Sequence, residues 1–299
     1  MSAPAVPPVL QATFWMCGAL FSFMLMAVSG RELSTELTTY QILFFRSLIG
    51  VLVIGILVTR SGWGQIRTHR PGAHLVRNLA HFGGQYGWFY GLAFISLAEV
   101  IAIEFTAPVW TALLAALLLG EKITLPRVVA LLLGITGLLL ILRPGMGVVH
   151  PAAFAVLAGA IGYALSYIQT KSLSATETPL CILFYMTLMQ LPMGMVPTLL
   201  DWHTPSLDAV PWILIVGLTA LSAHYCMARA FKLADATVVV PMDFMRLPLI
   251  ALVGYLFYQE VIDWPVVLGA GLMLTGNFIN ILAEHRKRLH LAELAKAPQ

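Results

Sequence analysis

The sequence predicts an all-α integral membrane protein, with ten transmembrane helices arranged as two inverted five-helix repeats around a central cavity. Three observations predict this fold class: the composition, the recurrence of long apolar runs, and an internal repeat. Of the 299 residues, 59% are hydrophobic and only 10% are charged, whereas a soluble globular domain carries about 25% charged residues. The composition therefore excludes an ordinary soluble domain.

Apolar runs of about 20 residues recur along the chain, which is the length that a helix needs to cross a hydrocarbon core of about 30 Å. Helices are expected because lipid offers no hydrogen-bond partner to exposed backbone groups. The expected spans are 9–29, 38–59, 74–95, 98–119, 126–143, 151–170, 179–200, 210–231, 237–258 and 265–284. Because the connecting segments are short, residues 1–299 are expected to form a single transmembrane domain.

Basic residues divide unevenly between the two expected sides of the membrane. Thirteen of the 17 lysines and arginines fall on one side, including those of the basic tail 285–299, and the other side receives only Arg31 and Arg143. The remaining two, Arg46 and Arg246, lie inside spans. The positive-inside rule then predicts that both termini, and the tail with them, lie in the cytoplasm.

An internal repeat divides the chain into two expected halves, 9–145 and 150–284. Residues 14–48 align with 154–188 at an offset of 140, and 105–140 align with 244–279 at an offset of 139. Five spans per half is an odd number, so the second half is expected to enter the membrane inverted. Inverted repeats are typical of secondary transporters, which bind substrate near the membrane midplane between the halves. A duplicated fold with no transport role is the alternative.

Four charged residues lie within the expected spans, where each costs roughly 2.5–3.5 kcal/mol. They are Arg46, Glu104, Asp243 and Arg246. Glu104 and Asp243 are equivalent in the repeat, and Asp243 lies three residues before Arg246, which favours pairing on one helix. A carboxylate for an ammonium group and an arginine for a carboxylate would suit a zwitterionic amino acid. Structural ion pairs and proton coupling through either acid are the alternatives.

The stretch HFGGQYGWFYG lies within the expected span 74–95 and divides into two helical faces. One face presents glycines at every fourth position, which permits close helix packing; these are Gly83, Gly87 and Gly91. The opposite face is polar and aromatic, and we expect it to line a cavity and contact substrate; it presents His81, Gln85 and Trp88. Hydrogen bonds between helices, with no substrate role, are the alternative for this face.

Other spans supply a second set of candidate substrate contacts, which are Trp110, Tyr163, Tyr167 and His224. Aromatic walls with a few polar groups suit amphipathic organic molecules. Prolines are expected to kink or interrupt spans four, seven and nine. Arg46 and the repeat-equivalent pair Glu121 and Glu260 are expected to have gating or structural roles. The cysteines are too far apart for a metal motif, and His74 is not expected in a ligand array.

Two segments carry a family resemblance. APVWTALLAALLLGEKI (107–123) and its repeat RLPLIALVGYLFYQEVI (246–262) resemble the signature of EamA-type members of the drug/metabolite transporter superfamily. The resemblance implies ten spans around a central cavity, and a bacterial inner-membrane transporter that exports small organic metabolites, foremost aromatic and other amino acids, by alternating access. Enzyme motifs and spaced metal ligands are absent from the sequence, so no enzyme activity, cofactor or metal is expected.

The expected partners are the small-molecule substrate and membrane lipid, without nucleic acid, and one monomer could hold the whole pathway. An importer of a larger metabolite and an exporter of cationic drugs are alternatives within transport. An integral membrane enzyme acting on lipid-linked substrates is the alternative from another class.

Overall fold

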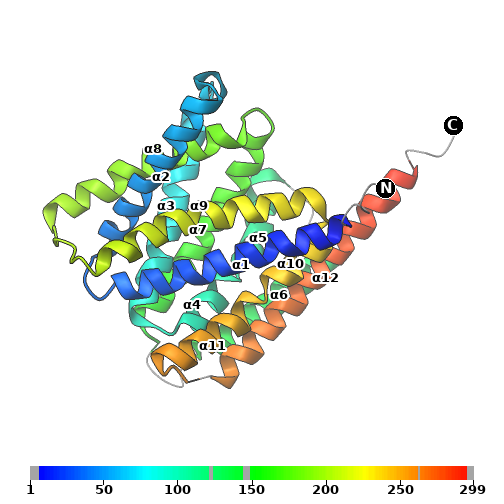
Figure 1. Cartoon of the computed structure of the whole chain (residues 1–299). Coiled ribbons are helices and arrows are strands. Elements are labelled where there is room, and N and C mark those ends of the chain that lie inside the picture. Colours follow the sequence, from blue (N-terminus) through cyan, green and yellow to red (C-terminus); the bar gives the residue numbers. More distant parts are fainter. Residues whose placement is uncertain (1–6, 121–123, 144–148, 262, 295–299) are drawn as a thin grey trace, which may run out of the picture.

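The computed structural model describes residues 7–120, 124–143, 149–261 and 263–294, and its regular elements in these ranges are all helical (Figure 1). The helices are α1 (Pro8–Leu33), α2 (Thr39–Ser61), the short 3₁₀ helix η1 (Trp63–Ile66), α3 (Pro71–Phe94), α4 (Leu97–Glu104), α5 (Ala107–Leu119), α6 (Leu125–Leu142), α7 (Pro151–Ser174), α8 (Pro179–Leu200), α9 (Ala209–Leu233), α10 (Ala236–Asp243), α11 (Arg246–Tyr258) and α12 (Trp264–Leu294). The all-α membrane fold predicted from the sequence is therefore confirmed.

Nine helical stretches within the described residues are long and apolar enough to cross a membrane. Two of them, Leu97–Leu118 and Val238–Tyr258, each combine two short helices. The expected tenth span is α3, which is long enough but carries polar residues such as Asn78, His81 and Gln85. These three side chains are buried, so other helices, rather than lipid, surround the polar face of α3.

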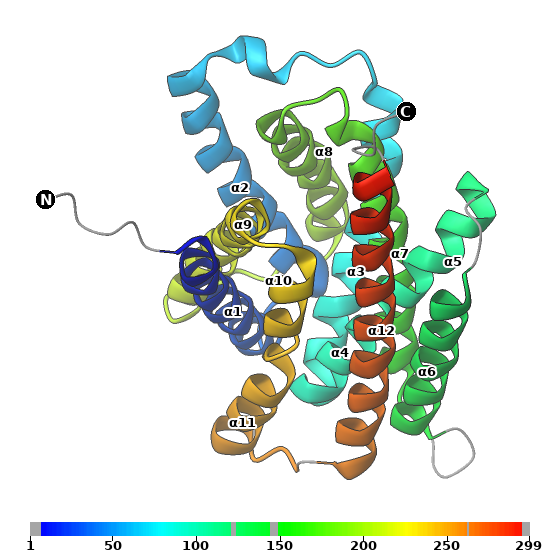
Figure 2. The same cartoon turned by 90° about the vertical axis from the view of Figure 1, so that its right-hand side faces the viewer.

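Helix boundaries recur between the halves of the chain. The ranges of α4 and α5 become those of α10 and α11 when 139 is added to each residue number. The packing repeats as well: α3 lies along α7 as α1 lies along α9, while α2 packs on α8 and α6 on α12 (Figures 1 and 2). This pattern maps onto itself when the halves are exchanged. It supports the predicted inverted halves 9–145 and 150–284.

Spans four and nine are interrupted at equivalent points. α4 ends at Glu104 and α5 begins at Ala107, while α10 ends at Asp243 and α11 begins at Arg246. The two interruptions meet, because the rings of Phe105 and Phe244 lie 4.4 Å apart between centroids. Span seven differs from this pattern, since α8 continues as one helix through its two prolines, Pro192 and Pro197.

Glycines allow α3 and α7 to approach closely. A Cβ added to Gly87 would meet the backbone of Ala155 on α7, and one added to Gly91 would meet the side chain of Val156. Gly84, which faces Gly159, belongs to the same contact. Gly83 does not: it is exposed and an added Cβ would meet nothing within 4 Å. The prediction that Gly83 belongs to the contact with α7 is therefore wrong, because Gly84 rather than Gly83 lies on the same face of α3 as Gly87 and Gly91.

Candidate functional site

A cavity of about 400 Å³ lies between the two halves. This volume falls within the range of about 300–1,000 Å³ that is typical of small-molecule sites. Eight helices line the cavity, which are α1, α2, α3, α4, α7, α9, α10 and α11. The lining residues are Phe23, Met26, Arg46, His81, Gln85, Trp88, Phe89, Glu104, Tyr163, Tyr167, His224, Met227, Phe231, Asp243 and Arg246.

The two helix breaks supply a charged cluster in the cavity wall. Arg246 Nη2 lies 2.9 Å from Asp243 Oδ2, and Arg246 Nη1 lies 3.3 Å from Glu104 Oε1. The pairing of Asp243 with Arg246 that the sequence predicted is confirmed. Trp88 Nε1 donates a hydrogen bond of 2.8 Å to the other oxygen of Glu104. Two carboxylates thus share one guanidinium, which leaves this cluster with one excess negative charge when the acids are ionised.

The excess negative charge lies at the two helix breaks. α4 and α10 end there at Glu104 and Asp243, and α5 and α11 begin there, so the opposite partial charges of the helix termini offset one another and the side chains set the sign of the charge. In addition, Asp243 Oδ1 is buried without a hydrogen-bond partner. This part of the cavity wall therefore favours a positively charged group on a ligand.

Arg46 on α2 supplies the opposite charge. Its side chain is only 6% exposed, and its Nε has no hydrogen-bond partner. Within the described part of the chain, no carboxylate forms an ion pair with Arg46. A buried cation without a counter-charge is unfavourable, so Arg46 favours a negatively charged group on a ligand. The sequence predicted a gating or structural role for Arg46, whereas the structure places it in the cavity wall.

His81 is held by two amides. Gln85 Nε2 and Gln190 Nε2 each lie 3.0 Å from His81 Nδ1. A ring nitrogen accepts a hydrogen bond only when it carries no proton, so the donor and acceptor roles in these two contacts depend on the tautomer of His81. The Tyr163 ring packs edge-on against His81, with 5.6 Å between ring centroids. The polar face of α3 thus both lines the cavity and forms hydrogen bonds between helices.

A cleft of about 420 Å³ adjoins the cavity and shares Tyr167 with it. Residues of α5, α6, α7 and α12 line the cleft, which extends as far as Lys171 near the end of α7. Trp110 lines neither space; its indole Nε1 donates a hydrogen bond of 3.0 Å to Thr106 Oγ1 on the preceding turn. The prediction that Trp110 contacts substrate is not supported by its position, because it packs against the buried apolar core instead.

At the opposite end of the molecule, called here the Arg31 end, polar contacts join α1, α4 and α11. Arg31 on α1 pairs with Glu260 and donates a hydrogen bond of 2.9 Å to the carbonyl oxygen of Ile95. The second oxygen of Glu260 accepts a hydrogen bond of 2.9 Å from the Leu97 amide at the start of α4. Glu260 therefore joins the end of α11 to α1 and α4. Its repeat equivalent, Glu121, lies outside the described residues.

Two further contacts reinforce the Arg31 end. Tyr258 donates a hydrogen bond of 2.6 Å from its hydroxyl to Glu32, and Arg143 pairs with Asp263. The second pair is more exposed, with side-chain exposures of 38% and 40% against 19% and 13% for Arg31 and Glu260. The pair of Arg31 with Glu260 is thus the more buried of these two ion pairs.

Sequence reasoning located most of the polar cavity wall. Nine residues predicted to contact substrate line the cavity, which are His81, Gln85, Trp88, Glu104, Tyr163, Tyr167, His224, Asp243 and Arg246. The apolar lining was missed, as was Gln190, which positions His81. An amide within an apolar span is a signal that would have found Gln190. For Phe23 or Met227 the sequence holds no comparable signal, because apolar side chains face cavities, helices and lipid alike.

Comparison with known proteins adds a family match and several relatives. The model of the EamA-like transporter family matches residues 10–143 and again 150–282. An S-adenosylmethionine uptake transporter of Rickettsia prowazekii is 26% identical, over 94% of this chain and 96% of its own length. A riboflavin transporter of Rhizobium johnstonii is 30% identical, over 95% of each chain. A pseudopaline exporter, CntI, of Pseudomonas aeruginosa is 30% identical, over 86% of this chain and 90% of its own.

One solved protein structure superposes with a TM-score of 0.63 at 17% identity, covering 93% of this chain and 98% of the other. At this identity the likeness shows the fold alone.

Proposed function

The chain belongs to the EamA-like transporter family, and from this premise we propose that it is a secondary transporter for zwitterionic metabolites. The family consists of multi-pass membrane transporters, not enzymes. The substrate that we propose carries an ammonium group and a carboxylate on one head group, as an amino acid does, and an apolar or aromatic body. Movement by alternating access uses the two halves of this one chain.

The charge distribution in the cavity carries this proposal. Arg46, which has no carboxylate partner among the described residues, lines the same cavity as the Glu104–Asp243–Arg246 cluster, whose excess charge is negative. A zwitterion satisfies both, with its carboxylate at Arg46 and its ammonium group at the cluster. Aromatic side chains such as Tyr163 supply the wall for the substrate body.

The named relatives are compatible with this class to different degrees. S-adenosylmethionine, the substrate named for the Rickettsia relative, carries an amino-acid head group. Riboflavin, named for the Rhizobium relative, carries neither an ammonium group nor a carboxylate. We therefore propose amino acids, and larger metabolites that bear an amino-acid head, as substrates, and we propose that riboflavin is rejected.

For direction, we propose export across a bacterial inner membrane with both termini in the cytoplasm. The basic residues support this orientation, which makes the Arg31 end periplasmic. We infer that the contacts at the Arg31 end block access to the cavity from the periplasm. The cleft that extends to Lys171 brings the cavity closer to the cytoplasmic side. An exporter that waits for cytoplasmic substrate would adopt this state.

Transport in liposomes tests the proposal. Protein of known orientation would be reconstituted, and efflux of labelled phenylalanine, S-adenosylmethionine and riboflavin would be measured with and without a pH gradient. We expect efflux of at least one zwitterion, competition between zwitterions, and no movement of riboflavin. Movement of riboflavin alone would refute the zwitterion proposal. Transport only from the periplasmic face of the protein to its cytoplasmic face would refute export. Acceleration by the pH gradient would assign proton coupling.

A further inference from the structure

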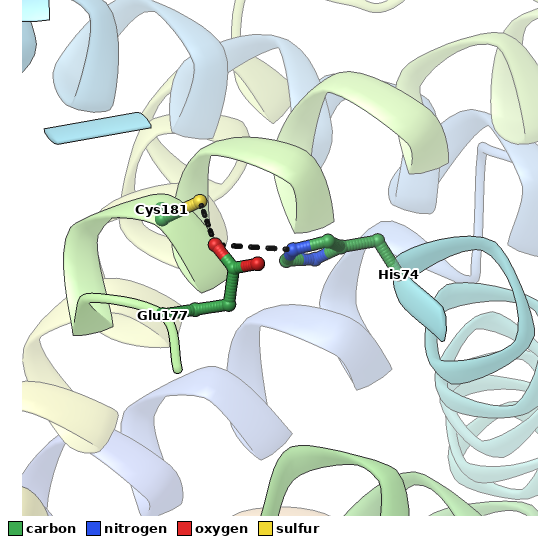
Figure 3. Close-up of side chains that lie close together, drawn as sticks. All are labelled: His74, Glu177 and Cys181. Carbon is green, nitrogen blue, oxygen red and sulfur yellow. Dashed lines mark hydrogen bonds and ion pairs between the residues drawn. The ribbon is translucent and has the colours of Figure 1, made fainter. Parts of the chain in front are cut away.

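Away from the cavity, three side chains that can ligate metal converge where α3 begins beside α8. His74 is the fourth residue of α3, Glu177 lies between α7 and α8, and Cys181 is the third residue of α8. Figure 3 shows the imidazole and the thiol both directed at one oxygen of Glu177. The spacing of these residues does not predict this cluster, because His74 and Glu177 lie 103 positions apart in the sequence.

The distances within the cluster are close to those of a metal site. Cys181 Sγ lies 3.0 Å and His74 Nε2 lies 3.9 Å from Glu177 Oε2, and the three ligand atoms lie within 4.8 Å of one another. Bonds of about 2.0–2.3 Å to a tetrahedral Zn²⁺ place its ligand atoms roughly 3.3–3.8 Å apart. Small side-chain shifts would therefore allow all three atoms to bind one ion.

Burial supplies a second, independent observation. The side chains of His74 and Glu177 are 0% and 4% exposed, and Cys181 is 0% exposed. Both ring nitrogens of His74 are buried without a hydrogen-bond partner, although the ring packs on Tyr185 with 4.6 Å between centroids. Buried polar atoms are normally paired, and a metal ion at Nε2 would pair the nitrogen that faces the cluster.

Surrounding contacts prepare Glu177 for this role. Thr68 donates a hydrogen bond of 2.7 Å to Glu177 Oε1, which leaves Oε2 directed at His74 and Cys181. Such outer contacts orient the ligands of metal sites.

We propose that His74, Glu177 and Cys181 bind one divalent transition-metal ion, with Zn²⁺ as the best match to a nitrogen, oxygen and sulfur ligand set. Binding forms bonds from the metal to His74 Nε2, a Glu177 oxygen and Cys181 Sγ, and the thiol proton leaves to the buffer. The ion would join α3, which carries His81 of the cavity, to α8 and the loop before it. This proposal does not depend on the proposed substrate or direction.

Cobalt and zinc titrations of the purified, tag-free chain test the proposal. After treatment with chelator, we expect one equivalent of Co²⁺ to produce a thiolate-to-metal charge-transfer absorption that Zn²⁺ abolishes. We expect Cys181→Ser to remove this absorption and His74→Gln or Glu177→Gln to weaken Zn²⁺ binding at least tenfold. Cys226→Ser, on α9, is the matched control and should change neither.

Several outcomes would overturn the site. Absence of the absorption in the wild-type chain would do so without any variant, and so would its survival in Cys181→Ser or its loss in Cys226→Ser. If Cys181→Ser does not fold, protection of Cys181 from alkylation by Zn²⁺ in the wild-type chain gives the same answer, and equal alkylation with and without Zn²⁺ would contradict the proposal.

Discussion

Glu104 and Arg246 come from opposite halves of the chain and meet at the two helix breaks, with 3.3 Å between Glu104 Oε1 and Arg246 Nη1. Glu104 is the last residue of α4 and Arg246 is the first residue of α11. Each charge therefore lies at the helix end whose partial charge has the same sign, which is unfavourable for either residue alone. The pair offsets this effect, and it fixes the two breaks against each other.

Replacing Arg246 by glutamine should destabilise the protein strongly. The change leaves Glu104 and Asp243, which are only 15% and 19% exposed, without a counter-charge, and loss of one partner from a buried ion pair costs about 3–5 kcal/mol. Unfolding in detergent, followed by the exposure of buried thiols, measures this loss. The double variant Asp243→Asn with Arg246→Gln removes one of the two stranded charges and should recover part of the stability. Equal stability of Arg246→Gln and wild type would contradict the interpretation.

Replacing Arg46 by glutamine should impair ligand binding without lowering the stability of the ligand-free protein. Because Arg46 is a buried cation without a carboxylate partner in the described residues, its removal should leave the stability of the ligand-free protein unchanged or raised. Stabilisation by a zwitterionic substrate should disappear, since the carboxylate loses its partner. Thermal unfolding with and without phenylalanine measures both effects. Stabilisation by the ligand equal to that of wild type would show that the carboxylate binds elsewhere.

The sequence predicted the positions of the helices and the residues of the charged cluster better than it predicted which residues of neighbouring helices are in contact. The span positions follow from length and hydropathy, and the equivalence of Glu104 with Asp243 follows from the repeat. The contact of Gly87 with α7 depends on how far α3 rotates about its axis, and neighbouring side chains of many helices determine that rotation. Because packing between helices is not evident from the sequence, Gly83 was wrongly predicted to contact α7, and Cys181 was not predicted to lie near His74.

Gly87 and Gly83 provide a matched pair for testing the contact between α3 and α7. A Cβ at position 87 would meet the Ala155 backbone, so Gly87→Ala should cost about 1–3 kcal/mol through overpacking. Position 83 faces open space, so Gly83→Ala should be neutral or stabilise by about 0.5–1 kcal/mol because alanine favours the helix. Unfolding midpoints of both variants in one detergent measure the difference. Equal midpoints would show that the helices separate at little cost.

Loss of the Glu260 contacts should open the Arg31 end more often, so these contacts are called the seal. Replacing Glu260 by glutamine removes the charge that Arg31 binds and weakens the hydrogen bond to the Leu97 amide. A hydrogen bond to a charged group contributes about 1.5–3 kcal/mol, so its weakening should raise the population open at this end by roughly tenfold. Asp263→Asn is the matched control: its pair with Arg143 is about 40% exposed and should contribute only about 0–1 kcal/mol.

Thiol labelling from the Arg31 side reads out this population. Met26→Cys places a thiol in the cavity wall, in a chain whose own cysteines are replaced by serine, and an impermeant maleimide reports access through the seal. We expect labelling in Glu260→Gln to be about tenfold faster than in the parent, and labelling in Asp263→Asn to remain within a few-fold of it. Equal rates in all three chains would mean that Glu260 tethers the loop without controlling access. A faster rate in Asp263→Asn than in Glu260→Gln would assign the seal to the more exposed pair instead, because burial is the reason for ranking Glu260 first.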